Sequence, residues 1–253
     1  MARFAVSGYV IRGTSFGESS RVITLFTLEK GKLKCVAKGA RKSATTKGGA
    51  IDLFSRIKCN IYLKEHAELG TIGSVDLSDN YSALASDPIK FGFGSAFCEI
   101  IDKSTTIEQP LPELYDLTGE FFKLMIKSGQ SASAPLFWAA LLRILIILGY
   151  QPRLFECAVC GRKNEGKAAF YDAQKGGLVC SKDVIEHVQY GKLSKAGLIA
   201  LQGFLNQSLN QIVQNDYPHK VLGEIEQFIL SFADYHTGLR RNLKSFKFLS
   251  QLK

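Results

Sequence analysis

The sequence predicts an α+β protein with a small five-stranded β-barrel at its N-terminus and an α-helical domain after it, into which a zinc knuckle is inserted. Before residue 80, short runs of alternating apolar and polar residues indicate strands. After residue 80, apolar residues recur at helical spacing, and a Cys-x-x-Cys-Gly motif at 157–161 interrupts the helices. We therefore expect a barrel domain at 1–79 and a helical domain at 80–253, with the zinc module at about 155–187.

The predicted strands fill the first 75 residues and are separated by turn residues. Five strands in so short a segment favour a closed barrel, because closure removes exposed strand edges. In the third strand Leu33 and Cys35 alternate with Lys32 and Lys34, so one face is apolar and the other is cationic. The predicted strands are 4–12, 21–28, 32–38, 51–64 and 67–75.

The helical domain is predicted from apolar stripes, and its most apolar helix is well delimited. Pro135 suits the first turn of that helix and Gly149 suits its end. The apolar run within it, 136–148, has thirteen residues and contains Arg143, whereas a membrane span needs about twenty. We therefore interpret it as a buried core helix and expect no membrane association. The predicted helices are 85–104, 111–128, 135–149, 194–206 and 220–237.

The excess positive charge is confined to the N-terminal part of the chain. Ten of the first fifty residues are Lys or Arg and two are acidic, so this segment carries +8 of the formal net charge of +9. In the fourth predicted strand Phe54 and Tyr62 share a face with Arg56 and Lys58, and aromatic rings between cations suit single-stranded nucleic acid. The clustering indicates a polyanionic partner, although a single Lys on a strand also protects a sheet edge.

The cysteines indicate a metal site. The first residues show no export signal, so we expect a reducing compartment in which a close cysteine pair serves metal or redox chemistry. A redox Cys-x-x-Cys opens a helix, whereas a glycine and polar residues follow here, which favours zinc. Cys157, Cys160 and Cys180 supply three ligands, and the fourth is Asp183 by spacing or His187 by chemistry. The competing interpretation is a degenerate site without metal.

An enzymatic alternative is a zinc-dependent deaminase. His66-Ala67-Glu68 together with Cys157-x-x-Cys160 imitates the H-x-E and P-C-x-x-C signature of those enzymes. Glu156 stands where the signature has Pro, and Cys180 would have no role. We interpret the H-x-E as a chance match to a short pattern.

Several segments closely resemble one protein family. The segments Gly-Tyr-Val-Ile-Arg (8–12), Phe-Gly-Glu-Ser-Ser-Arg (16–21), Thr-Leu-Phe-Thr (24–27), Gly-Lys-Leu (31–33) and Val-Ala-Lys-Gly-Ala-Arg-Lys (36–42) are similar to the start of the bacterial recombination mediators of the RecO family. Leu-Gly-Tyr-x-Pro (148–152), the Cys-x-x-Cys-Gly motif and Gly-Gly-Leu-Val-Cys (176–180) resemble the family's zinc segment, and Lys-Ser-Phe-Lys-Phe-Leu (244–249) resembles its tail.

The resemblance implies an N-terminal OB-fold, a helical domain with a zinc module, and a role in recombinational DNA repair. Such proteins bind single- and double-stranded DNA, anneal complementary strands, work with RecR, and help RecA to replace single-strand-binding protein (SSB). We expect the acidic SSB tail to dock on the helical domain, and the protein to lie in the bacterial cytoplasm with the nucleoid. The family's four-cysteine pattern is broken at Asp183.

Together, the charge and the resemblance predict DNA binding without catalysis. An OB barrel would hold DNA by neutralising phosphates, which is independent of sequence and suits annealing. No nucleotide-binding loop of the G-x-x-x-x-G-K-[ST] type is present, so we expect no enzyme activity. The alternative function is a zinc-ribbon adaptor in transcription or RNA metabolism. The predicted DNA-binding residues are Arg12, Arg21, Lys32, Lys34, Lys38, Arg41, Lys42, Lys47, Arg56 and Lys58, and the predicted structural Zn²⁺ ligands are Cys157, Cys160, Cys180 and Asp183.

Overall fold

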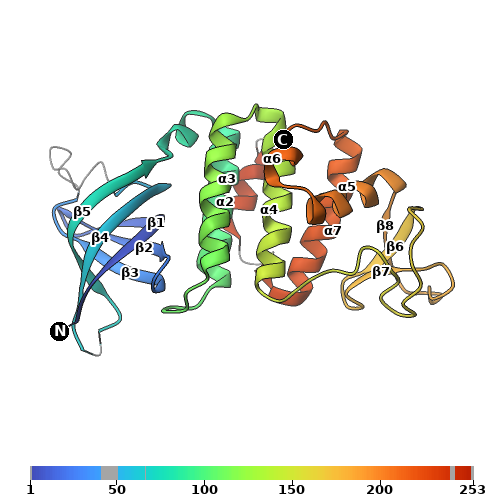
Figure 1. Cartoon of the computed structure of the whole chain (residues 1–253), viewed down its shortest axis with the longest axis horizontal. Helices are drawn as coiled ribbons and strands as arrows, with labels where there is room; N and C mark the ends of the chain where they lie inside the picture. The colour runs from blue at the N-terminus through green and yellow to red at the C-terminus, as the bar shows by residue number, and fades with distance from the viewer. Residues whose placement is uncertain (1, 41–50, 66, 240–242, 252–253) are drawn as a thin grey trace. The chain divides into compact units, whose positions relative to one another are not determined.

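The computed structural model describes residues 2–40, 51–65, 67–239 and 243–251, and the chain divides into two compact units (Figure 1). Unit 1 comprises Met1–Ile126 and Leu243–Lys253, and unit 2 comprises Lys127–Asn242. The expected boundary near residue 80 lies inside unit 1, because two helices that follow the strands, and the last helix of the chain, pack in the same unit as the strands.

All five predicted strands are present in unit 1. They form a closed barrel in the order β1-β2-β3-β5-β4, in which β1 pairs with both β2 and β4. The pairs are antiparallel except for β3 and β5, which are parallel. The strands are β1 (Ala2–Phe16), β2 (Ser20–Thr27), β3 (Gly31–Ala37), β4 (Ser55–Leu63) and β5 (Gly70–Asn80).

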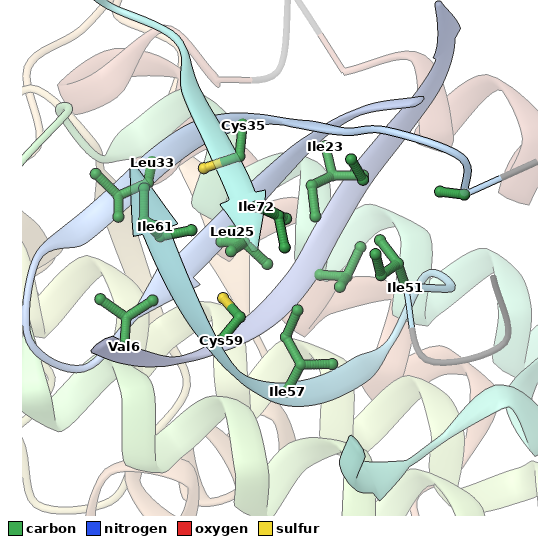
Figure 2. Close-up of a cluster of buried hydrophobic side chains, with 13 residues drawn as sticks. Val6, Ile23, Leu25, Leu33, Cys35, Ile51, Ile57, Cys59, Ile61 and Ile72 are labelled. Atoms are coloured by element: carbon green, nitrogen blue, oxygen red, sulfur yellow. The ribbon is translucent and has the colours of Figure 1, made fainter. Parts of the chain in front are cut away.

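Alternation along these strands fills the barrel with apolar side chains (Figure 2). Cys35 and Cys59 lie inside this core, where burial raises the pKa of both thiols to about 12. They are packing residues and are not candidates for metal binding. The labelled core residues are Val6, Ile23, Leu25, Leu33, Cys35, Ile51, Ile57, Cys59, Ile61 and Ile72.

Two helices of unit 1, α2 (Pro88–Ser104) and α3 (Pro112–Lys127), cover part of the barrel's outer surface, and the 3₁₀ turn η1 (Ser82–Ser86) precedes them. The short α8 (Lys244–Gln251) packs on α2. Asp87 caps α2 by accepting hydrogen bonds from the first backbone N–H groups. Tyr9 faces outward from β1 and packs on Tyr115 of α3, with ring centroids 4.8 Å apart. Gly119 permits this approach, since a Cβ there would lie 2.4 Å from the Tyr9 hydroxyl.

Phe54 corrects one expectation from the sequence. It was expected on the outer face of the fourth strand, but it precedes β4, has a φ of 70°, and is buried. Its ring packs against Phe91 and Phe122, with centroids 5.9 and 5.5 Å away. Positive φ breaks the strand alternation, so the side chain joins the aromatic core beneath the helices and is not available for stacking on a base.

Unit 2 is built around the predicted apolar helix. The stretch Gln130–Ile147 is long and apolar enough to cross a membrane by composition, but 67% of it is buried in the protein, as in a core helix. Gly149, with a φ of 93°, follows the helix end as predicted. The helices are η2 (Gln130–Ala132), α4 (Ser133–Ile147), α5 (Lys195–Asn206), α6 (Leu209–Ile212) and α7 (His219–Thr237).

The segment between α4 and α5 contains a three-stranded sheet that the sequence did not predict. Its order is β7-β6-β8, with β6 at Ala169–Asp172, β7 at Gly177–Val179 and β8 at Gly191–Leu193. These strands have three or four residues each, too few for a recognisable alternation.

Candidate nucleic-acid interface and metal centre

Three strands of the barrel present one shared outer face, which we call the hairpin face. Arg12, Thr24 and Lys34 form one row across β1, β2 and β3, and Thr14, Val22 and Val36 form the next. On β2 and β3 the neighbouring side chains, among them Ile23, Leu33 and Cys35, point into the core, so the residues of these two rows point outward. The hairpin face consists of Arg12, Thr14 and Phe16 on β1, Ser20, Val22 and Thr24 on β2, Lys34 and Val36 on β3, and Lys38 just after β3.

The hairpin face carries cations at its margins. The side chain of Arg12 is 64% exposed, and Lys34 and Lys38 are exposed. Towards the helices the same outer surface continues through Phe26 to Lys32, where α2 and α3 cover it. Three of the predicted cations therefore share one open sheet surface.

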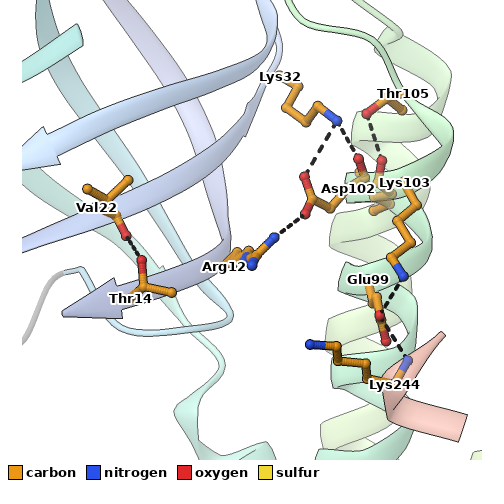
Figure 3. Close-up of polar contacts among 10 residues, drawn as sticks. Arg12, Thr14, Val22, Lys32, Glu99, Asp102, Lys103, Thr105 and Lys244 are labelled. Carbon is orange, nitrogen blue, oxygen red and sulfur yellow. Dashed lines mark hydrogen bonds and ion pairs between the residues drawn. The ribbon is translucent and has the colours of Figure 1, made fainter. Parts of the chain in front are cut away.

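Lys32 is the clearest departure from the predicted interface (Figure 3). It was expected on the exposed cationic side of β3, but it is 8% exposed and its ammonium lies 3.5 Å from a carboxylate oxygen of Asp102 on α2. The ammonium also donates to the Asp102 carbonyl. Arg12 binds the other carboxylate oxygen of Asp102 at 3.2 Å. Helix α2 packs over Lys32 because an ion pair and a carbonyl satisfy its charge there.

The other predicted cations are distributed over the barrel. Arg21 pairs with Asp52 at 3.0 Å and also donates to the Ile51 carbonyl. Arg56 pairs with Asp79 across the β4–β5 ladder, and Lys58 is exposed on β4, away from the hairpin face. Arg41, Lys42 and Lys47 lie outside the described residues. Within the described part of the chain, Lys34, Lys38 and Lys58 have no carboxylate partner.

The second site is a cluster of potential metal ligands in unit 2. The ligand atoms of Cys157, Cys160, Cys180 and Asp183 all lie within 4.8 Å of one another. The positive φ of Gly161 closes the first Cys turn, and a hydrogen bond of 2.7 Å from the Ala158 N–H to the Leu178 carbonyl joins it to the second.

The geometry suits a tetrahedral metal. Two thiolates on one zinc ion lie about 3.8 Å apart when each Zn–S bond is about 2.3 Å, and the sulfurs of Cys160 and Cys180 are 3.9 Å apart. Asp183 lies 2.9 Å from the Cys180 sulfur and 3.2 Å from that of Cys157. Hydrogen bonds from the thiols, that of Cys160 first, lower the pKa of the Asp183 carboxyl to about 2. His187, the alternative fourth ligand, is exposed and is not part of the cluster.

Two family models together cover most of the chain. Residues 1–81 match the family model described as "Recombination protein O N terminal", and residues 85–245 match "Recombination protein O C terminal". The chain belongs to the RecO family. Its relatives are bacterial proteins named "DNA repair protein RecO", and a role in DNA repair follows.

Three RecO relatives indicate how far the similarity extends. The protein of Desulfitobacterium hafniense (strain DSM 10664 / DCB-2) is 32% identical over an alignment of 237 residues, which covers 90% of this chain and 84% of the relative. That of Syntrophotalea carbinolica is 30% identical over 243 residues, 96% of this chain and 92% of the relative. That of Anaeromyxobacter dehalogenans is 30% identical over an alignment of 257 residues, which covers 100% of this chain and 98% of the relative.

Proposed function

We propose that this RecO-family protein is a recombination mediator that binds single- and double-stranded DNA and anneals complementary strands. With RecR, it would assist RecA loading onto SSB-coated DNA. The observation that carries the proposal is the hairpin face, where Arg12, Lys34 and Lys38 share one exposed surface of a five-stranded barrel. We interpret the barrel as an OB-fold, a fold that binds oligonucleotides through its sheet face and adjoining loops.

The proposed mechanism is electrostatic and needs no catalytic residue. Cations on the hairpin face neutralise phosphates and reduce the repulsion between two strands, while the bases remain free to pair. Such contacts carry no sequence information, which suits annealing of arbitrary strands. The protein would act in the bacterial cytoplasm, in association with the nucleoid.

Charge removal on the hairpin face tests the proposal. Each phosphate contact on a single strand contributes about −0.7 to the slope of log affinity against log salt. Lys34→Ala/Lys38→Ala should therefore make the slope shallower by about 1.4 and weaken binding to different sequences equally. The matched control is Lys123→Ala/Lys127→Ala, which removes two exposed cations from α3. If the salt slope of Lys34→Ala/Lys38→Ala is unchanged, the DNA site does not lie on the hairpin face.

We also propose that the cysteine cluster holds one structural Zn²⁺ per chain. Four protein ligands leave no open position for a water nucleophile, so the ion would stabilise the fold of its module. Elemental analysis should find about one zinc per chain. Asp183→Ala should lower the occupancy while His187→Ala leaves it unchanged, and the reverse result would assign the fourth position to His187.

The SSB tail remains a proposed partner of the segment 80–253. An acidic peptide with an apolar end requires an apolar pocket rimmed by cations. Binding of that peptide should weaken with salt without disappearing, because part of the free energy is apolar burial. If the peptide competes with single-stranded DNA for the hairpin face, the peptide-binding site lies on the barrel instead.

A further inference from the structure

Phe16 occupies an unusual place for an aromatic residue. It ends β1 at the tip of the β1–β2 hairpin, directly opposite Ser20, and a short turn beginning at Gly17, with a φ of 60°, connects the strands. Its side chain is 55% exposed. Among the described residues no other ring packs against it, so it makes no contribution to an aromatic core.

The surroundings of Phe16 are cationic. It lies on the same side of β1 as Arg12, four residues earlier, because side chains alternate along a regularly paired strand. That spacing places the two residues about 14 Å apart, and β3 with its Lys34 and Lys38 lies about 10 Å across the sheet. An exposed ring therefore stands at one corner of a small surface whose other corners are positively charged.

We propose that Phe16 is a stacking site for an unpaired nucleobase, and that it biases the hairpin face towards single-stranded nucleic acid. This inference rests on the proposed DNA-binding function. A base offers an aromatic face to the ring while its phosphates reach the cations, which is the arrangement that single-strand-binding surfaces use. In a duplex each base is already stacked on its neighbours, so Phe16 gains little from it.

The charge pattern favours nucleic acid over a protein partner at this tip. Glu18 in the turn is the one carboxylate between residues 12 and 24, and the face itself carries none. An acidic peptide would satisfy the cations, but it would not need a planar ring. The distinction can be measured, since stacking does not depend on counterion release and phosphate contact does.

The experiment compares wild type with Phe16→Leu on two single strands of equal length, oligo-dT and the same backbone with abasic positions. Stacking on one base accounts for about 5- to 160-fold in affinity, so Phe16→Leu should weaken oligo-dT binding within that range. Binding to the abasic strand and to a duplex should change less than twofold. The salt slope should stay unchanged, and Phe16→Tyr should retain wild-type affinity.

A matched control removes another exposed apolar side chain from the same barrel. Leu77 on β5 is 45% exposed, and Leu77→Ala should leave oligo-dT binding unchanged. A second readout is Phe16→Trp, because the natural Trp138 is 4% exposed and serves as an internal reference. The fluorescence of the tryptophan introduced by Phe16→Trp should be quenched by oligo-dT and not by the abasic strand.

Two results would overturn the inference while the proposed function stands. One is salt-dependent oligo-dT binding that Phe16→Leu does not weaken, and the other is an equal loss on the abasic strand. Absence of salt-dependent binding to either strand by wild-type protein would instead overturn the proposed function and the stacking site together.

Discussion

Glu99 on α2 secures the last helix of the chain to unit 1, and its removal gives a sharp test of that contact (Figure 3). Its carboxylate accepts hydrogen bonds from the backbone N–H groups of Lys244, at 3.0 Å, and Ser245, at 2.8 Å. The Ser245 hydroxyl donates to it at 2.7 Å, and Lys103 pairs with it at 3.1 Å. These N–H groups open α8, so Glu99 caps a helix that lies 145 residues away in the sequence.

Glu99→Gln keeps the shape of the side chain but replaces one acceptor oxygen with an NH₂ group that faces backbone donors. Loss of a cap of this kind costs about 1–2 kcal/mol, which corresponds to an increase of about 5- to 30-fold in the opening of α8. Hydrogen exchange of the peptide that covers 243–251 should accelerate by that factor. Glu113→Gln, which changes an exposed carboxylate on α3, is the matched control.

The effect of Glu99 should depend on pH. Although partial burial opposes it, hydrogen bonds from the Lys244 and Ser245 backbone lower the pKa of Glu99 from 4.5 to about 2. A folded-state pKa below the unfolded value stabilises the fold above pH 4.5, and this stabilisation is lost as the pH falls towards 2. Wild type and Glu99→Gln should therefore converge at low pH after correction for intrinsic exchange rates. A rate difference at neutral pH below twofold, or one that is as large at pH 2 as at neutral pH, would refute the assigned role.

Two further substitutions test packing and capping. Gly119→Ala would place a Cβ 2.4 Å from the Tyr9 hydroxyl, and such overpacking should destabilise unit 1 by about 1–3 kcal/mol in urea unfolding, partly relieved by Tyr9→Phe. Ser194→Ala removes the N-cap of α5 and a hydrogen bond of 2.7 Å to Glu224, so unit 2 should lose about 1–2 kcal/mol of stability to heat, while Ser194→Thr should retain most of it.

The regular elements were predictable because their signals are local. Alternation identified all five barrel strands, and helical spacing with Pro135 and Gly149 delimited α4. The clustering of Cys157, Cys160, Cys180 and Asp183 was also predictable, since a two-residue gap after Cys180 brings the Asp183 carboxylate next to the three thiols.

The errors of the sequence-based prediction arise from contacts between distant residues or from single backbone angles. The burial of Lys32 depends on Asp102, which lies 70 residues later in the chain. The inward turn of Phe54 depends on a positive φ that composition does not reveal. Helix α8 has eight residues, too few for independent stability, and it depends on the distant cap from Glu99. Phe16 could have been noticed, because alternation places it on the side of Arg12 immediately before a glycine turn.

Cation counts alone overstate the phosphate-binding capacity that we propose for this barrel, and exposure decides which paired cations can still contribute. An ion pair in solvent is worth about 0–1 kcal/mol, so Arg12, with a side chain 64% exposed, can exchange Asp102 for a phosphate at little cost. Lys32 binds the same carboxylate with its side chain 10% exposed, and its removal from Asp102 would leave a buried charge without a partner. Of the two cations that Asp102 binds, Arg12 is therefore available for the proposed phosphate contact, whereas Lys32 fixes α2 to the barrel.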